Sequence, residues 1–177
     1  MEIMRLLVTG PVGAGKSTFI QAVGNLYGLE TEHPNGDDAP SINDRNPAPK
    51  DFGEISLGPN QVLHLYGLPG QLQRNLQWET LLQKAHACLL LVSANRPGKF
   101  RHARWLHRWL QDQLALPVVV GLTNTDGVNA WDVDNVALAL GLVDETDCIP
   151  VLRINLKDQT SVRDALLTLV GQYLKAA

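Results

Sequence analysis

The sequence predicts an α/β fold with a six-stranded, mostly parallel sheet, one antiparallel strand and about five helices. The first supporting observation is that short apolar runs, typical of buried parallel strands, alternate with segments of helical periodicity. The second is that Gly58-Pro59-Asn60 separates two strand-like runs too closely for a helix, which predicts a hairpin and hence the antiparallel strand. The third is the length of 177 residues with 45% hydrophobic residues, which suits a single domain over 1–177.

The elements follow in a regular order along the chain. The predicted strands are 3–9, 52–57, 61–66, 87–93, 117–122 and 148–154. The predicted helices are 15–26, one that follows a loop at 67–77 and ends near residue 86, and then 100–114, 130–140 and 161–174. Residues 28–50 are polar, acidic and rich in proline, which indicates a long loop of the kind that is usually functional or disordered.

Composition and charge limit the partners and the compartment that we expect for this chain. The net charge is −3 with 19% charged residues, which gives no reason to expect nucleic acid. Cys88 and Cys148 have no metal-ligand spacing and are interpreted as buried thiols in a reducing compartment. No apolar run reaches the ~20 residues of a membrane span, and no lipidation signal is present. We therefore expect a cytoplasmic protein without an intrinsic membrane anchor.

A glycine-rich segment at residues 10–17 carries the strongest chemical signal. It reads GPVGAGKS and fits the phosphate-loop pattern GxxxxGK[ST] between a predicted strand and a predicted helix. Glycines let backbone N–H groups surround a phosphate, the lysine reaches the β- and γ-phosphates, and the serine hydroxyl can coordinate Mg²⁺. The predicted nucleotide-binding residues here are Gly10, Gly13, Ala14, Gly15, Lys16, Ser17 and Thr18, with Lys16 also catalytic and Ser17 the metal ligand. We therefore expect the three-layer fold of the P-loop NTPases.

The order of elements after the glycine-rich loop distinguishes between the classes of protein that carry such a loop. A hairpin that follows the first helix and the long acidic loop is typical of Ras-like proteins rather than nucleotide kinases. The segments DFGEI at 51–55 and LHLYGLPGQ at 63–71 resemble the small bacterial and archaeal Ras-like GTPases, including the gliding-motility (Mgl-type) proteins and related predicted P-loop GTPases. The resemblance covers nearly the whole chain.

This resemblance implies roles for the second loop and for a partner. Gly70 matches a glycine whose N–H contacts the γ-phosphate, and Gln71 matches the catalytic glutamine that orients the attacking water. Gly67 stands where most GTPases have a magnesium-shell aspartate, although this branch commonly lacks it. The branch implies a roadblock/longin-type regulatory protein, which we expect to bind through residues 28–50 and 67–80.

The family's base-recognition segment corresponds to residues 123–126. Asp126 matches the aspartate that accepts two hydrogen bonds from guanine, and Thr123 is a known alternative to asparagine. Adenine lacks those two donors, so it would leave the carboxylate unpaired. Asn124 replaces the usual lysine, and Leu156 and Lys157 lie where a further segment backs the base.

The expected function is a regulatory switch that binds GTP or GDP with Mg²⁺ and hydrolyses GTP to GDP. No threonine stands at Asn46-Pro47, where the family's first switch coordinates Mg²⁺, and no arginine is obviously placed as a finger, so we expect slow turnover. Because Asn124 departs from the guanine signature, an ATP-binding P-loop kinase or ATPase stays open. A Ras-like scaffold that does not hydrolyse nucleotide is the other alternative.

Overall fold

A computed structural model describes residues 2–28, 51–70, 76–143 and 149–176. Its strands are β1 (Glu2–Thr9), β2 (Asp51–Gly58), β3 (Gln61–Gly67), β4 (Ala87–Ser93), β5 (Val118–Thr123) and β6 (Val151–Arg153). Its α-helices are α1 (Lys16–Leu26), α2 (Leu76–Gln83), α3 (Phe100–Leu114), α4 (Val133–Leu140) and α5 (Gln159–Ala176), with a 3₁₀ turn η1 (Pro97–Lys99) before α3.

The strands of the described residues form one sheet in the order β2-β3-β1-β4-β5-β6. Every neighbouring pair is parallel except β2 and β3, which form the antiparallel hairpin. The predicted α/β fold, with six strands, one antiparallel pair and five helices, is therefore confirmed over the described residues. Because β2 runs against the others, its first residue, Asp51, pairs with the last residue of β3, Gly67.

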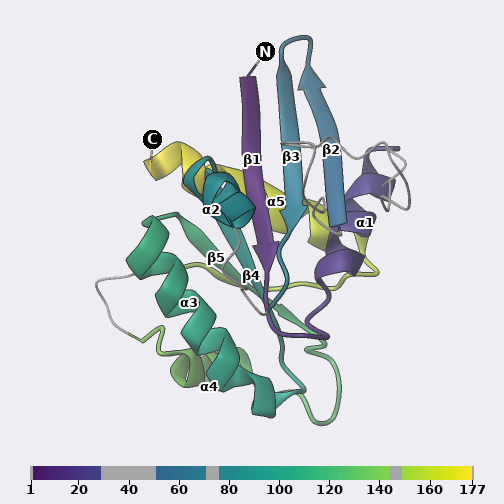
Figure 1. Ribbon diagram of the computed structural model, residues 1–177. Helices are drawn as coiled ribbons and strands as arrows, with labels where there is room; N and C mark the ends of the chain where they lie inside the picture. Colours follow the sequence, from purple (N-terminus) through teal and green to yellow (C-terminus); the bar gives the residue numbers. More distant parts are fainter. Residues whose placement is uncertain (1, 29–50, 71–75, 144–148, 177) are drawn as a thin grey trace.

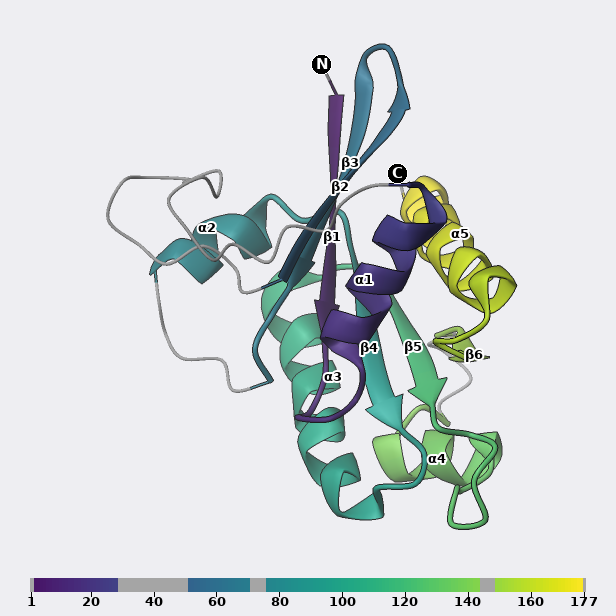
Figure 2. The ribbon, with the colours of Figure 1, turned by 90° about the vertical axis from the view of Figure 1, so that its right-hand side faces the viewer.

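Helices cover both faces of the sheet, which makes three layers. Figure 2 shows the sheet nearly edge-on, with α2 and α3 on one side and α1 and α5 on the other. One core cluster joins β-strand side chains to α2, α3 and α4, and the second joins them to α1 and α5. Strand β4 is buried along its whole length, as expected of a strand with helices on both faces.

Several element boundaries differ from the sequence prediction. The helix predicted at 130–140 begins at Val133, because the Asp132 carboxylate caps it by accepting a hydrogen bond (2.8 Å) from the backbone N–H of Asn135. Helix α2 ends at Gln83 rather than near His86, because Lys84 and Ala85 make tighter backbone bonds to the residues three positions earlier. The last strand is three residues long.

Two predictions from composition concern single residues and spans. Cys88 is buried in β4, and burial raises the pKa of its thiol well above the ordinary value, so the thiol stays protonated. Cys148 lies outside the described residues. No helix within the four described ranges is both long enough and apolar enough to cross a bilayer.

The carboxyl ends of the parallel strands meet at one edge of the sheet. In Figure 2 the arrowheads of β1, β4 and β5 point down, and the loop between β1 and α1 turns at this lower edge. Figure 1 shows the same loop at the base of β1, beside the ends of β3 and β4. In open α/β sheets ligands bind outside this edge, so the predicted site residues should gather there.

Candidate functional site

The loop from Gly10 to Gly15 has the backbone of a phosphate cradle. Gly10, Gly13 and Gly15 have φ angles of 150°, 80° and 102°, a region that side-chain-bearing residues rarely adopt. A Cβ on Gly10 would overlap the carbonyl oxygen of Leu91 in β4, so this position also needs glycine for a close approach. Within the described residues no side chain caps the N-terminus of α1, which leaves its positive end open to an anion.

Lys16, the first residue of α1, folds its side chain over this loop. Its Nζ donates hydrogen bonds to the carbonyl oxygens of Gly10 (2.6 Å) and Pro11 (3.0 Å). Burial lowers the pKa of Lys16 below its ordinary value, and the carboxylate of Asp51 partly offsets this lowering. The cation therefore lies beside the cradle and next to a carboxylate.

That carboxylate belongs to Asp51, a residue that sequence reasoning did not single out. The Ser17 hydroxyl donates a hydrogen bond to Asp51 Oδ2 at 2.6 Å. A Cβ on Gly67 would lie 2.8 Å from the Cβ of Asp51 and 3.3 Å from its Oδ2. Asp51 thus occupies the space beside Gly67 at the end of β3.

The start of the second loop packs directly on the phosphate loop. A Cβ on Gly70 would lie 2.5 Å from the carbonyl oxygen of Gly10 and 3.4 Å from the Cα of Pro11. Only a glycine allows the two loops to approach this closely. Gln71, the predicted catalytic residue, lies outside the described residues, as does most of the predicted partner-binding surface at 28–50 and 67–80.

The predicted base-recognition segment follows β5 at the same edge. The buried Thr123 hydroxyl donates to the carbonyl oxygen of Ala14 (2.8 Å), which ties this segment to the phosphate loop. Asn124 has a positive φ of 53°, and its side-chain amide donates to Ser93 Oγ (2.7 Å) at the end of β4. Asp126 is exposed in the turn that follows.

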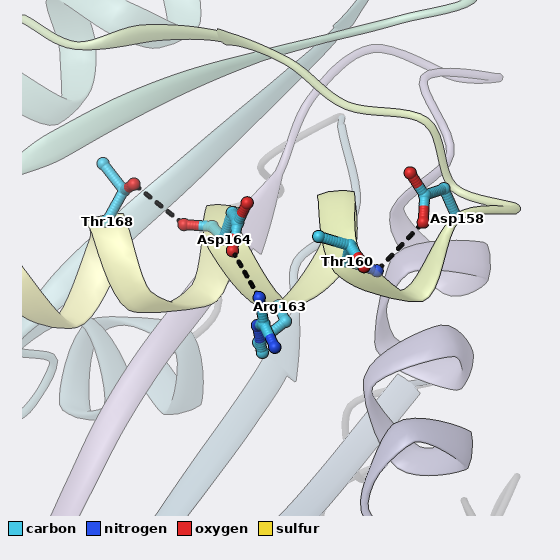
Figure 3. A network of polar contacts seen from close by, with 5 residues as sticks. All are labelled: Asp158, Thr160, Arg163, Asp164 and Thr168. Atoms are coloured by element: carbon cyan, nitrogen blue, oxygen red, sulfur yellow. Dashed lines mark hydrogen bonds and ion pairs between the residues drawn. The ribbon is translucent and has the colours of Figure 1, made fainter.

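The segment after β6 also reaches the phosphate loop. A Cβ on Gly15 would lie 2.6 Å from Leu156 Cδ1, so this leucine packs against the loop just before α1. Lys157 is exposed, and its backbone N–H donates to Asn155 Oδ1 (3.1 Å). Next to it, Asp158 Oδ1 accepts from the N–H of Thr160 (3.0 Å) at the start of α5, as Figure 3 shows.

The structure brings most of the predicted site residues to one edge of the sheet. Thr18 is exposed on the first turn of α1, and Ala14 is buried beneath the loop. Two further residues there were missed: Asp51, and Arg96, whose guanidinium lies against Gly13. The signal for Asp51 was its place at the start of the predicted hairpin, opposite the end of the partner strand.

No protein-family model matches the chain, and the search of curated proteins finds no significant match. The sequence motifs and the geometry of this edge of the sheet therefore carry the inference of function.

Proposed function

We propose that this chain is a small Ras-like GTPase that binds GTP and GDP with Mg²⁺ and hydrolyses GTP slowly as a regulatory switch. The observation that carries the proposal is the loop of residues 10–17. It joins the carboxyl end of the central strand to the uncapped start of α1, with three glycines in positive-φ conformations and Lys16 folded over it. This arrangement has the backbone donors and the cation that a nucleoside di- or triphosphate requires.

Phosphate binding would use groups that the loop already presents. The bonds from Lys16 to the carbonyl oxygens of Gly10 and Pro11 hold its ammonium group at the mouth of the cradle. From there it would exchange a neutral carbonyl for a phosphate oxygen. Because phosphates carry negative charge, a bound nucleotide would raise the pKa of Lys16 again and favour its charged form.

The magnesium site would draw on Ser17 and Asp51. Mg²⁺ in such sites keeps several waters and takes few protein ligands, so a hydroxyl beside one carboxylate fits it. A bound Mg²⁺ would supply positive charge that stabilises the phosphoryl group during transfer. The Ser17 oxygen would be the direct ligand. Asp51 would accept the hydrogen bond from the Ser17 hydroxyl and would orient water molecules around the ion. This places on β2 the role that an aspartate at position 67 has in most Ras-like proteins.

Guanine recognition would fall to the segment after β5. Asp126 would accept hydrogen bonds from guanine N1–H and N2–H₂, and Thr123 would hold the segment at the phosphate loop through Ala14. Leu156, which packs on Gly15, and Lys157 would lie behind the base.

Hydrolysis and regulation would depend on the second loop. We assign to the Gly70 N–H a contact with the γ-phosphate, and to Gln71 the orientation of the attacking water. Residues 28–50 and 67–80 would bind a roadblock/longin-type regulatory protein. Gly70 packs on Gly10 and Pro11, so a partner that displaced the second loop would also disturb the phosphate loop. This packing supports regulation through the second loop.

The test is a calorimetric titration of nucleotide-stripped protein with GDP, a non-hydrolysable GTP analogue and the matching ATP analogue, each with Mg²⁺. We expect tight guanine nucleotide binding that Asp126→Ala weakens by about a hundredfold or more, because the base donors lose their acceptor. Asp112→Ala, an exposed aspartate on α3, is the matched control. Preference for the ATP analogue would instead indicate a kinase or ATPase, and binding of no nucleotide would indicate a scaffold.

A further inference from the structure

The side chain of Arg96 lies on the phosphate loop, although it comes from a different strand connection. Arg96 follows β4, three residues after Ser93. A Cβ on Gly13 would overlap Arg96 Nη1 and would lie 3.0 Å from Cζ and 3.5 Å from Nη2. The guanidinium group therefore packs against the backbone of Gly13.

The position of Gly13 indicates which part of a nucleotide this guanidinium would meet. The proposed function assigns Gly70 to the γ-phosphate, and Gly70 packs on Gly10 and Pro11, so the γ-phosphate would lie near the start of the loop. Leu156, which is assigned to the base, packs on Gly15, so the base would lie near the end of the loop. Gly13 lies between these two boundaries. The loop N–H groups in this middle part cradle the α- and β-phosphates, so a cation on Gly13 lies closer to them than to the γ-phosphate.

Hydrogen bonds on both sides hold the backbone of Arg96 in place. The N–H of Arg96 donates to the Ser93 carbonyl (3.1 Å), and its own carbonyl accepts from Lys99 (3.0 Å) in the 3₁₀ turn. Pro97 follows directly and restricts the chain further. The side chain is exposed, and within the described part of the structure its guanidinium makes no ion pair.

A hydrogen-bond chain ties this connection to the base segment. Asn124 Nδ2 donates to Ser93 Oγ (2.7 Å), and Ser93 Oγ donates to Asn95 Oδ1 (2.7 Å), the residue before Arg96. Asn124 stands where Ras-like proteins usually carry a lysine, so the base segment here supplies no cation. Its amide instead fastens the connection from which Arg96 reaches the loop.

We propose that Arg96 is a nucleotide-binding residue that donates hydrogen bonds to the α- or β-phosphate. The inference rests on the proposed nucleotide-binding function. Guanidinium groups bind phosphate oxygens in pairs through two parallel N–H donors. Because GDP and GTP share these two phosphates, Arg96 contributes equally to the affinity for both. It does not act on the γ-phosphate during hydrolysis.

The experiment measures the Kd of GDP and of a non-hydrolysable GTP analogue for wild type, Arg96→Ala and Arg96→Lys, together with the hydrolysis rate at saturating GTP. Arg101→Ala, an exposed arginine at the start of α3, is the control for loss of one positive charge. We expect Arg96→Ala to raise both Kd values about 10- to 100-fold and by the same factor, as for loss of a charged hydrogen bond. Arg96→Lys should lie between wild type and Arg96→Ala, and the hydrolysis rate at saturation should not change.

Three results would overturn this assignment, and they are distinguishable. Unchanged Kd values in Arg96→Ala, with wild type binding both nucleotides, would remove Arg96 from the site and leave the proposed function intact. A loss confined to the hydrolysis rate would make Arg96 a group that acts on the γ-phosphate instead. If wild type binds neither nucleotide, the proposed function itself fails and the role of Arg96 fails with it. Matching thermal unfolding of Arg96→Ala and Arg101→Ala would verify that each variant is folded.

Discussion

Replacing Asp51 with asparagine should selectively weaken the magnesium-dependent part of nucleotide binding. The bond from Ser17 Oγ to Asp51 Oδ2 is 2.6 Å long, in the range of hydrogen bonds that a carboxylate strengthens by its charge. Such bonds contribute about 1.5–3 kcal/mol. Because Ser17 is exposed, we take the lower end, which corresponds to a factor of about ten in an equilibrium constant.

The measured quantity is the ratio of the GDP dissociation constant in excess chelator to that in millimolar Mg²⁺. Asp51→Asn should reduce this ratio about tenfold, because the amide cannot accept the hydroxyl proton with the same strength or balance the charge of the ion. Without Mg²⁺ the variant should bind GDP at least as well as wild type, since a negative charge near the phosphates is removed. Asp112→Asn, the same chemical change on the exposed face of α3, should leave the ratio unchanged.

A double-mutant cycle with Ser17→Ala separates a direct partnership from a general charge effect. If Asp51 acts through the Ser17 hydroxyl, the two substitutions together should lower the ratio little more than either alone. Full additivity would show that the two residues act independently. A wild-type ratio in Asp51→Asn would refute the assignment of Asp51 to the magnesium site.

Two further predictions test the packing and the charge of the β2–β3 hairpin. Gly67→Ala should lower the free energy of unfolding by about 1–3 kcal/mol in urea titrations, because its Cβ would lie 2.8 Å from that of Asp51. Adding Asp51→Gly should recover part of the loss, and Gly58→Ala, with open space around it, should cost less; equal stability of Gly67→Ala and wild type would contradict the reasoning. The second prediction concerns pH: burial lowers the pKa of His64 below its ordinary 6.5, an effect that Glu54 partly offsets. The unfolded chain then binds more protons, so the free energy of unfolding should fall as pH drops through 6.5 and level off below the folded pKa. His64→Gln should flatten this dependence in denaturation curves recorded between pH 7.5 and pH 5, whereas an unaltered slope would exclude His64 as its source.

The fold was predictable because its signals are local. Buried parallel strands such as β4 are continuous apolar runs, and the turn at residues 58–60 leaves no room for a crossover helix. Element ends were less accurate, because a single side chain can decide them. Asp132 delays the start of α4 by accepting one backbone hydrogen bond, which no periodicity reveals.

The site was predictable where one contiguous segment carries the chemistry, as in residues 10–17. It was not predictable where residues meet through tertiary pairing. Asp51 faces Gly67 because of the register of the hairpin, which shifts between Ser56 and Gly58. Arg96 reaches Gly13 from a connection more than eighty residues further along the chain, after β4 has been placed beside β1. Such proximity depends on the completed sheet and has no spacing signature.

The central place of β1 also constrains when the sheet can assemble during synthesis. The ribosome releases β1 first, yet its two neighbours in the sheet are β3 and β4, which end at residues 67 and 93. Until β4 emerges, the first nine residues lack one of their two strand partners, and Gly10 lacks the Leu91 carbonyl against which it packs. A nascent chain that stops before this point contains the whole loop sequence without its support. The glycine-rich loop at residues 10–17 therefore lacks its full support until β4 has been synthesised.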